Sequence, residues 1–449
     1  MTKLWQKEGT TVSQKIEKFT VGRDRELDLQ LAPFDVQGSL AHARMLNHIG
    51  LLTGEELSGL QAALSEIYQA ILAGDFEIEE GVEDVHSQVE LQLTRKLGDI
   101  GKKIHSGRSR NDQVLIDLKL FSRSRLREVV DLTSRLFEVL VDRAEEHKND
   151  LLPGYTHLQI AMPSSFGLWF SAYAEGLLDD IVQLHAAYRL ANRNPLGSGA
   201  GYGSSFPLDR QMTADLLGFE GLHVNVVYAQ MSRGRTEQAV LNAVASLAAT
   251  LSRLAMDVCL YNSQNFGFLL LPDEMTTGSS IMPHKKNPDV AELLRARCNR
   301  LKALPAEVTM VLSNLPSGYH RDMQLLKEIL MPALDEILEC LDIAVFMLTH
   351  IRVSAGLLAE EKYDLLFSVE RVNELVMQGI PFRDAYRQVG AEIAGNTYRA
   401  PRELNHTHIG SIGNLRLDLL KSRLHDERAQ FQFEKADEAV RKLLDGNAS

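Results

Sequence analysis

The sequence contains little cysteine, and its cysteines are far apart. Cys259, Cys298 and Cys340 are the only three in 449 residues, and none belongs to a CxxC pair or lies near a histidine-rich stretch. A disulfide framework or a cysteine-based zinc site needs closely spaced groups of such residues. We therefore expect three reduced cysteines within apolar helices, no metal site and a cytoplasmic protein.

Long uncharged apolar runs and an excess of positive charge are also missing. No apolar segment reaches membrane-spanning length without charged residues, and no apolar run follows the lysines of residues 1–9, which argues against a secretory signal. The 48 Lys and Arg against 60 Asp and Glu give a formal net charge of -12. Because nucleic-acid binding needs a basic surface, we expect neither a nucleic-acid nor a membrane partner, although a local basic pocket for an acidic substrate is allowed.

Strand patterns are scarce, because long alternating runs of Val, Ile and Thr do not occur. Helical patterns are abundant: residues 109–152 contain no Gly or Pro, a length of roughly 65 Å if fully helical, and residues 235–266 are similarly uninterrupted and more apolar. We also expect helices over residues 55–72, 164–193, 289–313 and 323–352. Helices this long and apolar cannot be buried within one small domain, which favours an elongated bundle that packs against copies of itself.

The pattern of breaks divides the chain into three expected parts. Residues 1–107 alternate short helical patterns with glycine breaks and predict an N-terminal helical domain. Residues 108–357 predict the central bundle of long helices, and residues 358–449, which are shorter segments broken by Gly and Pro, predict a small C-terminal helical domain. Internal repeats and low-complexity tracts are not found.

One polar loop carries the most constrained pattern of the chain. Residues 277–289 read TGSSIMPHKKNPD, and Gly278 and Pro283 disfavour a helix within them. Asn287 and Pro288 predict the start of the next helix, with Asn287 as the N-cap and Pro288 as the first helical residue. Most loops of Ser, Gly and Lys are solvated connectors, but the pattern GSSxMPxKxN is more constrained than a connector requires.

Four further polar segments interrupt the helical patterns: HSGRSRNDQ at 105–113, GYTHLQ at 154–159, NPLGSGAGYG at 194–203 and SGYHRDMQLLK at 317–327. Each of these segments alone is weak evidence for a functional site. By composition the first is a capped helix start, with Ser109 or Asn111 as N-cap, although an Arg and an Asn beside a helix N-terminus also make an anion site. The glycine-rich segment follows no Val/Ile-rich strand and lacks both the GxGxxG spacing and a P-loop lysine, so a nucleotide site is not indicated.

Four patterns, taken together and in chain order, closely resemble the argininosuccinate lyase family of the fumarase/aspartase superfamily: HSGRSRNDQ, GYTHLQ, PLGSGA and GSSxMPxKKNPD. The resemblance extends from about residue 35 to about residue 385. It implies a mostly α, three-domain fumarase/aspartase-like fold with a central bundle of long helices, and a homotetramer in which each active site draws on three subunits. It also implies release of fumarate from argininosuccinate to give L-arginine, the last step of arginine biosynthesis, without a cofactor.

The resemblance assigns roles to the loop residues. The reaction removes a proton from the carbon beside a carboxylate and expels a guanidinium nitrogen, so it needs a base, an acid and donors that stabilise the carbanion. Ser279 is implied as the base and Ser280 as a substrate-binding residue. A serine is a poor base unless donors stabilise its alkoxide, which Lys285 and the N–H groups of the loop are able to do, while Asn287 would hold a carboxylate.

A histidine and a glutamate complete the implied catalytic set. Histidine titrates near neutral pH, which suits His157 either to donate the proton or to position the substrate, and the residues alone leave both roles open. Glu292, about one turn into the helix after the loop, is implied as the carboxylate partner that makes this histidine more basic.

The remaining site residues are implied by position in the matching segments. Ser109, Arg110, Asn111 and Thr156 surround the succinyl end, with Tyr319, Gln324 and Lys327 nearby. Arg233 falls where the family has an arginine within Ser-Asp-Arg-Asp; the sequence departs here, and Arg235 is the alternative. Asp24 and Asp28 fall where the family has a serine and, four residues on, an aspartate that hold the arginine end, and two aspartates still suit a cationic group.

Two other functions compete with this interpretation. Adenylosuccinate lyase shares the Ser-Ser-x-Met-Pro-x-Lys-x-Asn loop and the succinyl chemistry, but its substrate adds a purine and a phosphate. A non-catalytic structural relative, of the kind recruited to the eye lens, is the second alternative, and the presence of both Ser279 and His157 disfavours it. We further expect residues 275–287 to be mobile when the site is empty and ordered over bound substrate.

Overall fold

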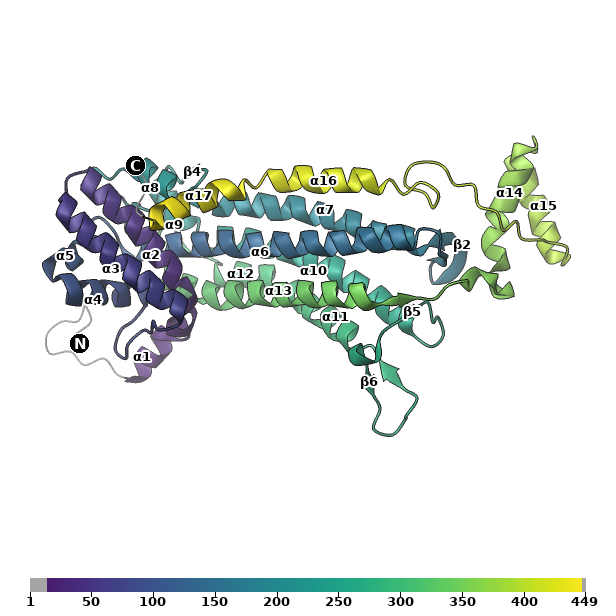
Figure 1. Cartoon of the computed structure of the whole chain (residues 1–449), viewed down its shortest axis with the longest axis horizontal. Helices are drawn as coiled ribbons and strands as arrows, with labels where there is room; N and C mark the ends of the chain where they lie inside the picture. Colours follow the sequence, from purple (N-terminus) through teal and green to yellow (C-terminus); the bar gives the residue numbers. More distant parts are fainter. Residues whose placement is uncertain (1–13, 446–449) are drawn as a thin grey trace.

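Long helices run lengthwise through the computed structural model, which describes residues 14–445 (Figure 1). They are α6 (Arg110–Glu146), α7 (Phe166–Ala191), α10 (Arg235–Asn262), α11 (Asp289–Leu301) with α12 (Leu304–Val311), and α13 (Leu326–His350). Their apolar faces form the main hydrophobic core, in which Phe137, Leu178 and Leu247 are fully buried. The expected bundle of long helices, and with it the mostly α fold, is confirmed.

Two of the long helices, α6 and α7, begin at a serine cap. Ser109 is the N-cap of α6: its hydroxyl accepts from Asn111 N at 3.3 Å, and the Asp112 carboxylate accepts from Ser109 N at 2.8 Å. This reciprocal pair satisfies amides that would otherwise lack a helical partner. Ser165 caps α7 with a single bond, in which its hydroxyl accepts from Leu168 N at 3.0 Å.

Several expected helix ends are wrong. The helix expected over 109–152 ends at Glu146, because residues that follow enter β1 (Leu151–Thr156), which pairs antiparallel with β2 (Gln159–Ser165). The expected helix 164–193 spans only Phe166–Ala191, and the helix expected over 235–266 stops at Asn262, where Ser263 adopts an extended conformation. β1 and β2 were missed because proline and glycine interrupt their alternation.

The prediction of one helix over residues 289–313 is also wrong, because this stretch forms two helices. α11 ends at Leu301, and α12 restarts at Leu304 with a proline in its first turn. The expected N-cap is also wrong: Pro288 is the cap residue, and Asn287 lies in β7 (Lys286–Asn287), which pairs with β6 (Thr277–Gly278). The helix expected over 323–352 is shorter, because a 3₁₀ turn at Arg321–Leu325 precedes α13.

A second hydrophobic core lies at the N-terminal end of the bundle. It is formed mainly by α2 (Asp24–His48), α3 (Gly54–Ala73), α4 (Val85–Leu97) and α8 (Arg210–Leu216), with α6 packed against α2. The helix expected over 55–72 lies within α3. α1 (Gln14–Val21), α5 (Asp99–Lys102), the 3₁₀ turn Lys103–His105, β3 (Arg193–Asn194), β4 (Gly221–Leu222) and α9 (Val226–Met231) complete this half of the chain.

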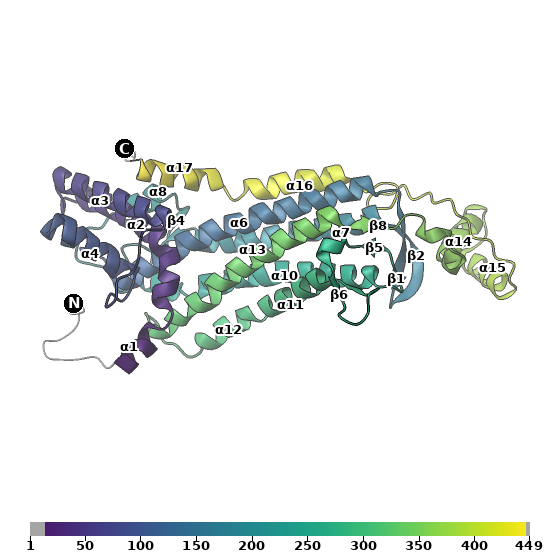
Figure 2. The ribbon, with the colours of Figure 1, turned by 60° about the horizontal axis from the view of Figure 1, so that its bottom comes forward.

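The C-terminal stretch forms two different structures. α14 (Ser368–Met377) and α15 (Phe382–Ala394) pack on each other at the far end of the molecule around Val372, Leu375 and Val389. α16 (Leu417–Ala429) and α17 (Phe433–Leu444) instead return along the bundle, so that α17 contacts α2 and α8 (Figure 2). The short elements β5 (Leu269–Leu270), β8 (Arg352–Val353) and the 3₁₀ turns Asp273–Met275, Leu357–Ala359 and Glu361–Phe367 connect the bundle to this end. The domain boundaries near 107 and 357 stay predictions.

α10 contributes many buried residues to the main core. Among the described residues it is the one helix long and apolar enough to cross a membrane, and 50% of its most apolar window is buried inside the chain. Cys298 and Cys340 are buried and Cys259 is partly buried, and all three are free thiols, which confirms the expectation that they are not joined by disulfides.

Candidate active site

A cavity of about 180 Å³ opens where α2, α4 and α6 meet the start of α13. The predicted binding residues that line it are Asp24, Asp28, Arg110, Asn111, Arg233, Tyr319, Gln324 and Lys327. These residues come from four separate stretches of the sequence. The structure therefore brings together in one chain the predicted residues of the arginine end with part of the set expected around the succinyl end.

A buried lysine between two carboxylates forms one side of this cavity. Lys327 Nζ lies 2.6 Å from Asp24 Oδ1 and 2.6 Å from Asp28 Oδ1, and the side chains of Lys327 and Asp28 are almost completely buried. Burial by itself lowers the pKa of Lys327, but the charges of Asp28 and Asp24 outweigh it and raise that pKa. Burial raises the pKa of Asp24. The lysine is therefore a fixed ammonium with one carboxylate in excess beside it.

Arg110 forms the opposite wall through acidic partners that sequence reasoning missed. Its guanidinium lies 2.9 Å from Glu83 Oε2 and 3.4 Å from Asp84 Oδ2. Arg321 reaches the other oxygen of Glu83 at 3.3 Å. Glu83 is therefore shared between Arg110 and Arg321, and the three charged side chains form one ion-pair network on the cavity wall.

Arg233 is held by the segment that precedes α13. Its guanidinium donates to Met323 O at 3.0 Å and lies 5.7 Å from the centroid of the Tyr319 ring. Arg233 lines the cavity, which favours it over Arg235, the first residue of α10. Gln324 Nε2 donates to Thr20 O at 2.9 Å, so its amide is engaged by the end of α1.

Ser109 caps α6 next to the cavity but does not line it. Its neighbour Asp112 is fully buried and accepts from Gly197 N at 3.0 Å and Gly199 N at 2.9 Å. The glycine-rich segment therefore wraps around the carboxylate that also closes the capping box of α6. This contact explains the glycines of that segment without a bound nucleotide, because backbone N–H groups approach closely only where side chains are small.

The serine loop projects away from the bundle between β6 and β7 (Figure 1). Ser279 Oγ accepts from Met282 N at 3.1 Å and from Ile281 N at 3.3 Å, and Lys285 Nζ donates to Asn287 Oδ1. Ser280, like the rest of the loop tip, is exposed or nearly so. The predicted base thus has N–H donors aimed at its oxygen, while the mobility of the loop stays a prediction.

His157 and Thr156 lie at the turn between β1 and β2, at a third location. His157 has φ 54° and Leu158 φ 58°, left-handed values for two residues that are not glycine, and both are exposed. Glu292 lies in the first turn of α11. In the described part of the chain we find no hydrogen bond between His157 and Glu292, so the expected pair stays a prediction.

The three groups are separated along the long axis of the molecule. The cavity lies at the end that carries α2 and α4, the serine loop emerges beside α11, and the β1–β2 turn lies toward the end that carries α14 (Figures 1 and 2). One chain therefore does not assemble the predicted catalytic residues around its own cavity.

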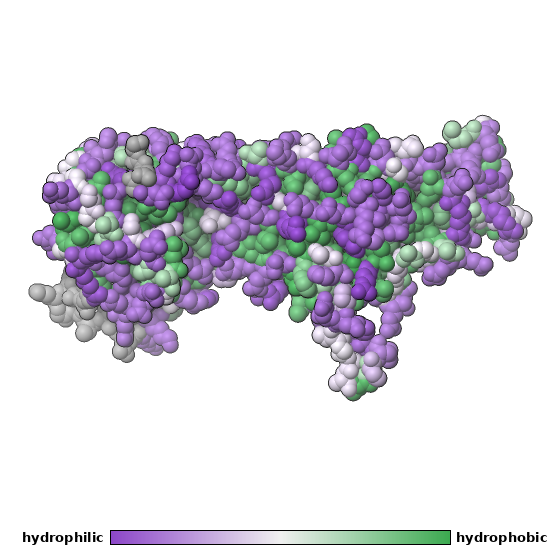
Figure 3. All heavy atoms as spheres, in the orientation of Figure 1, coloured by the Kyte–Doolittle hydropathy of each residue, from purple (hydrophilic) through white to green (hydrophobic). Residues whose placement is uncertain are grey.

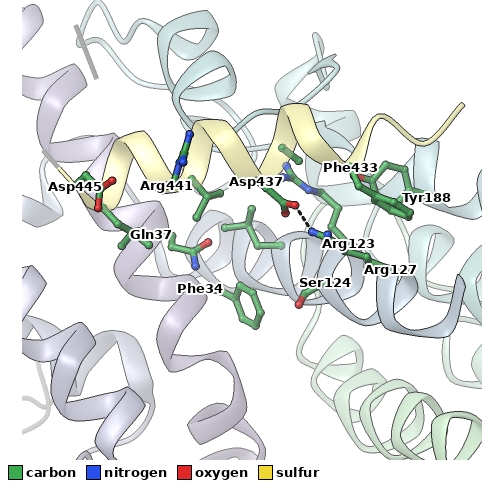
Figure 4. A pocket seen from close by; sticks show the side chains of 14 residues that line it. Phe34, Gln37, Arg123, Ser124, Arg127, Tyr188, Phe433, Asp437, Arg441 and Asp445 are labelled. Carbon is green, nitrogen blue, oxygen red and sulfur yellow. Dashed lines mark hydrogen bonds and ion pairs between the residues drawn. The ribbon is translucent and has the colours of Figure 1, made fainter. Parts of the chain in front are cut away.

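A larger cavity of about 340 Å³ lies elsewhere, between α17 and the helices α2 and α6 (Figure 4). Its wall combines aromatic residues with arginines, and Arg127 is paired with Asp437 across it. None of the predicted site residues lines this cavity. It is therefore distinct from the candidate active site.

Comparison with known proteins decides the family. The model of the Lyase family matches residues 9–302. An argininosuccinate lyase of Parabacteroides distasonis is 59% identical over 444 residues, which cover 99% of this chain and 99% of that protein. The chain belongs to the argininosuccinate lyase family.

Solved structures place this argininosuccinate lyase family member among other lyases of the same fold. An EDDS lyase in complex with formate matches with a TM-score of 0.78 at 21% identity, covering 98% of this chain and 96% of that chain. A class II fumarase from Schistosoma mansoni matches with a TM-score of 0.69 at 17% identity, covering 96% and 94%. At such identities the likeness shows the fold alone, and it confirms the expected fumarase-like architecture.

Besides the apolar Val114, four polar residues that line the candidate cavity were not predicted from the sequence: Glu83, Asp84, His86 and Arg321. The first three stand in the run Glu-Asp-Val-His after Gly81, where Asp84 is the N-cap of α4 and accepts from Ser87 N. The sequence did offer a sign of a functional site here, namely two acidic residues and a histidine at a helix start. An ordinary capped helix explains the same pattern equally well.

Proposed function

We propose that the chain catalyses the reversible cleavage of argininosuccinate to fumarate and L-arginine in the cytoplasm. The observation that carries the proposal is a cavity lined both by the cations Lys327, Arg110 and Arg233 and by the carboxylates of Asp24 and Asp28. Argininosuccinate has three carboxylates, an ammonium and a guanidinium, so a site that recognises it needs fixed charges of both signs.

The chemical step begins at the serine loop. The Ser279 alkoxide removes a proton from the succinyl carbon beside a carboxylate, and the electron pair left on carbon is delocalised into that carboxylate. The Ser279 oxygen already accepts two backbone N–H groups, and such donors favour the alkoxide form. Lys285 and Asn287 add a cation and an amide to the same loop, and Ser280 contacts the substrate.

The carbon–nitrogen bond then breaks. The electron pair of the carbanion forms the double bond of fumarate, and the guanidinium nitrogen leaves with the bonding pair and takes up a proton. His157 either donates this proton or orients the substrate, with Glu292 as its carboxylate partner. Arginine and fumarate are the two products, and no electrons are gained or lost overall.

We infer that a homotetramer brings Ser279, His157 and the cavity together, each from a different subunit. Ser279, His157 and the cavity lie at three places on one chain, so a complete site requires three subunits. Apolar side chains stay exposed on the bundle helices, including Met256, Leu293, Met310 and Phe346, and apolar residues gather on the surface of the bundle (Figure 3). Such surfaces are typical of subunit interfaces.

The test is the release of fumarate, followed by its ultraviolet absorbance, from argininosuccinate and in parallel from adenylosuccinate. We expect turnover of argininosuccinate alone. Turnover of adenylosuccinate instead would assign the chain to the other branch of the superfamily, and no turnover of either by a folded tetramer would indicate a structural role.

A further inference from the structure

The cavity of about 340 Å³ between α2, α6 and α17 has the size of a small-molecule site (Figure 4). Its wall carries aromatic side chains from three helices, Phe34 on α2, Tyr188 on α7 and Phe433 on α17. Such faces bind an apolar ring. The polar groups of the same wall show what else an occupant of this cavity must carry.

The charged residues of the wall are in positive excess. They are three arginines and two aspartates: Arg123, Arg127, Arg441, Asp437 and Asp445. Arg127 and Asp437 form an ion pair, so these two charges balance each other. The whole chain has a net charge of -12, which makes a positively charged cavity a local exception. A wall of this kind favours a negatively charged ligand.

Arg123 is the buried cation of the cavity. It is 7% exposed, its Nη1 donates to Leu217 O at 3.0 Å, and its guanidinium carbon lies 4.5 Å from the centroid of the Phe219 ring. In the described part of the chain, we find no carboxylate paired with it. Burial lowers the pKa of Arg123, and the charge of Asp437, which is already paired with Arg127, opposes this only in part.

A buried guanidinium without a carboxylate partner is unfavourable, and an anion beside it removes much of that cost. The contacts to Leu217 and Phe219 also fix the direction of the guanidinium before any ligand binds. A carboxylate or a phosphate matches its planar set of N–H donors. Arg123 therefore indicates where the charged group of a ligand lies.

Gln37 is a second buried polar group without a partner. It is 7% exposed, and its amide points from α2 into the cavity (Figure 4). Among residues 14–445 we find no hydrogen bond to this amide. Buried side-chain amides are nearly always hydrogen-bonded in folded proteins, and an amide N–H₂ group donates to an anionic oxygen. Gln37 therefore adds a neutral donor to the site.

This cavity and the candidate active site lie on the same two helices but far apart. On α2, Gln37 follows Asp28 by nine residues, about 14 Å along a helix. On α6, Arg123 follows Arg110 by thirteen residues, about 20 Å. A ligand the size of one substituted ring does not reach from one cavity into the other.

We propose that the cavity between α2, α6 and α17 is a second ligand site, which takes a small organic anion composed of an apolar ring and one carboxylate or phosphate group. Arg123 binds the anionic group, Gln37 donates to it, and Phe34 and Phe433 contact the ring. This site is separate from the residues assigned to argininosuccinate cleavage, and the proposal does not depend on that activity.

The first test asks whether binding needs both parts of the ligand. Phenyl phosphate and benzoate carry a ring and an anion, inorganic phosphate lacks the ring, and phenol lacks the charge. Calorimetry on the full-length protein at pH 7.5 should give a Kd of about 1 mM or tighter for at least one of the two ring anions. Inorganic phosphate and phenol should bind at least about tenfold more weakly. Tighter binding of phenyl phosphate assigns a phosphate to the ligand, and tighter binding of benzoate assigns a carboxylate.

The second test places the bound anion. Arg123→Met should weaken the better ring anion at least about tenfold, since a charge-assisted contact is lost. Two controls should stay within about twofold of wild type: Arg135→Met, at an exposed arginine of the same helix, and Arg110→Gln, in the candidate active site.

Two further variants keep the test decisive if Arg123→Met does not fold. Gln37→Leu keeps the size of the side chain and removes its amide, and Val440→Trp fills the cavity from the partly exposed side of α17. We expect Gln37→Leu to weaken the ring anion about threefold or more and Val440→Trp to abolish its binding. Circular dichroism confirms that each variant is folded.

Four results overturn the proposal. The first is the absence of binding of both ring anions by wild type. The second is inorganic phosphate or phenol that binds as tightly as the ring anions. The third is wild-type affinity in folded Arg123→Met or in Val440→Trp. The fourth is a loss of binding in Arg110→Gln, which would place the probe in the candidate active site. None of these results bears on the cleavage of argininosuccinate, which is measured separately by fumarate release.

Discussion

At the scale of single residues, Lys327 and its two partners Asp24 and Asp28 set the net charge on one side of the cavity. One carboxylate balances the ammonium and the second makes this side of the cavity net negative. Asp28→Asn should raise the KM for argininosuccinate by about ten- to a hundredfold, because one charged contact is lost and the excess negative charge beside the Lys327–Asp24 pair disappears. Asp99→Asn, at an exposed carboxylate, is the control in steady-state kinetics, and equal KM values in both variants would contradict the role of Asp28.

Lys119 gives a stability prediction that is independent of the active site. Its Nζ is buried and donates to Leu190 O and Thr236 Oγ1, each at 3.1 Å, and burial lowers its pKa to about 8. Between pH 8 and about 10.5 the unfolded chain holds this proton more often than the folded chain, so the contribution of Lys119 to stability rises with pH.

Lys119→Met should remove that rise and should be at least as stable as wild type at pH 7. Urea unfolding at pH 7.5 and 9.5 measures the change, with the exposed Lys421→Met as control. If the free energy of unfolding of Lys119→Met rose between pH 7.5 and 9.5 as much as that of wild type, the buried ammonium would not titrate as described.

Most cavity residues were predictable because they stand in polar segments that interrupt helical patterns, as Arg110 and Lys327 do. Glu83 and His86 were not, since their roles depend on the approach of α2, α4 and α6 in space. Asp35 lies 51 residues before His86 in the sequence, and Asp117 lies on a third helix, so nothing in the sequence indicates that the three side chains meet.

At the scale of elements, the close packing of α17 on the rest of the chain requires a glycine at position 218. A Cβ on Gly218 would lie 2.8 Å from Ala436 Cα and 2.9 Å from Ala439 Cβ, and its φ is +65°. Gly218→Ala should lower the free energy of unfolding by about 2 kcal/mol or more, because α17 must shift and the backbone is strained.

Gly50 is the matched control, with φ +77° and nothing within 4 Å of its added Cβ. Gly50→Ala should cost only about 1 kcal/mol, the strain of the left-handed backbone. Chemical denaturation of both variants measures the difference, and equal losses would show that close packing of α17 adds nothing.

The existence and order of the helices could be predicted, whereas their ends could not. α11 and α12 share one continuous apolar pattern, and their break at Lys302 and Ala303 lies just before Pro305, which has no N–H to bond the preceding turn and begins a new helix instead. β1 and β2 contain prolines, which removed the alternation that identifies a strand.

At the scale of the whole molecule, the separation of the site residues predicts a tetramer. Light scattering coupled to size-exclusion chromatography should give about 200 kDa, four times the chain mass of 50.1 kDa. A monomer with full activity would contradict a site shared among subunits.

Shared sites also predict complementation. Asp28→Asn and Ser279→Ala should each be poorly active alone, whereas mixed tetramers contain sites that combine an intact cavity from one subunit with an intact serine from another. Denaturing and refolding the two variants together should recover a measurable fraction of wild-type fumarate release. Recovery should fail when either variant is refolded with itself.

The most direct measurement of the central claim is single-turnover fumarate release from argininosuccinate by wild type and by Ser279→Ala. The account predicts that wild type forms fumarate, and that Ser279→Ala still binds argininosuccinate by calorimetry but forms fumarate at least about a thousandfold more slowly. Near wild-type turnover in Ser279→Ala would show that another group removes the proton.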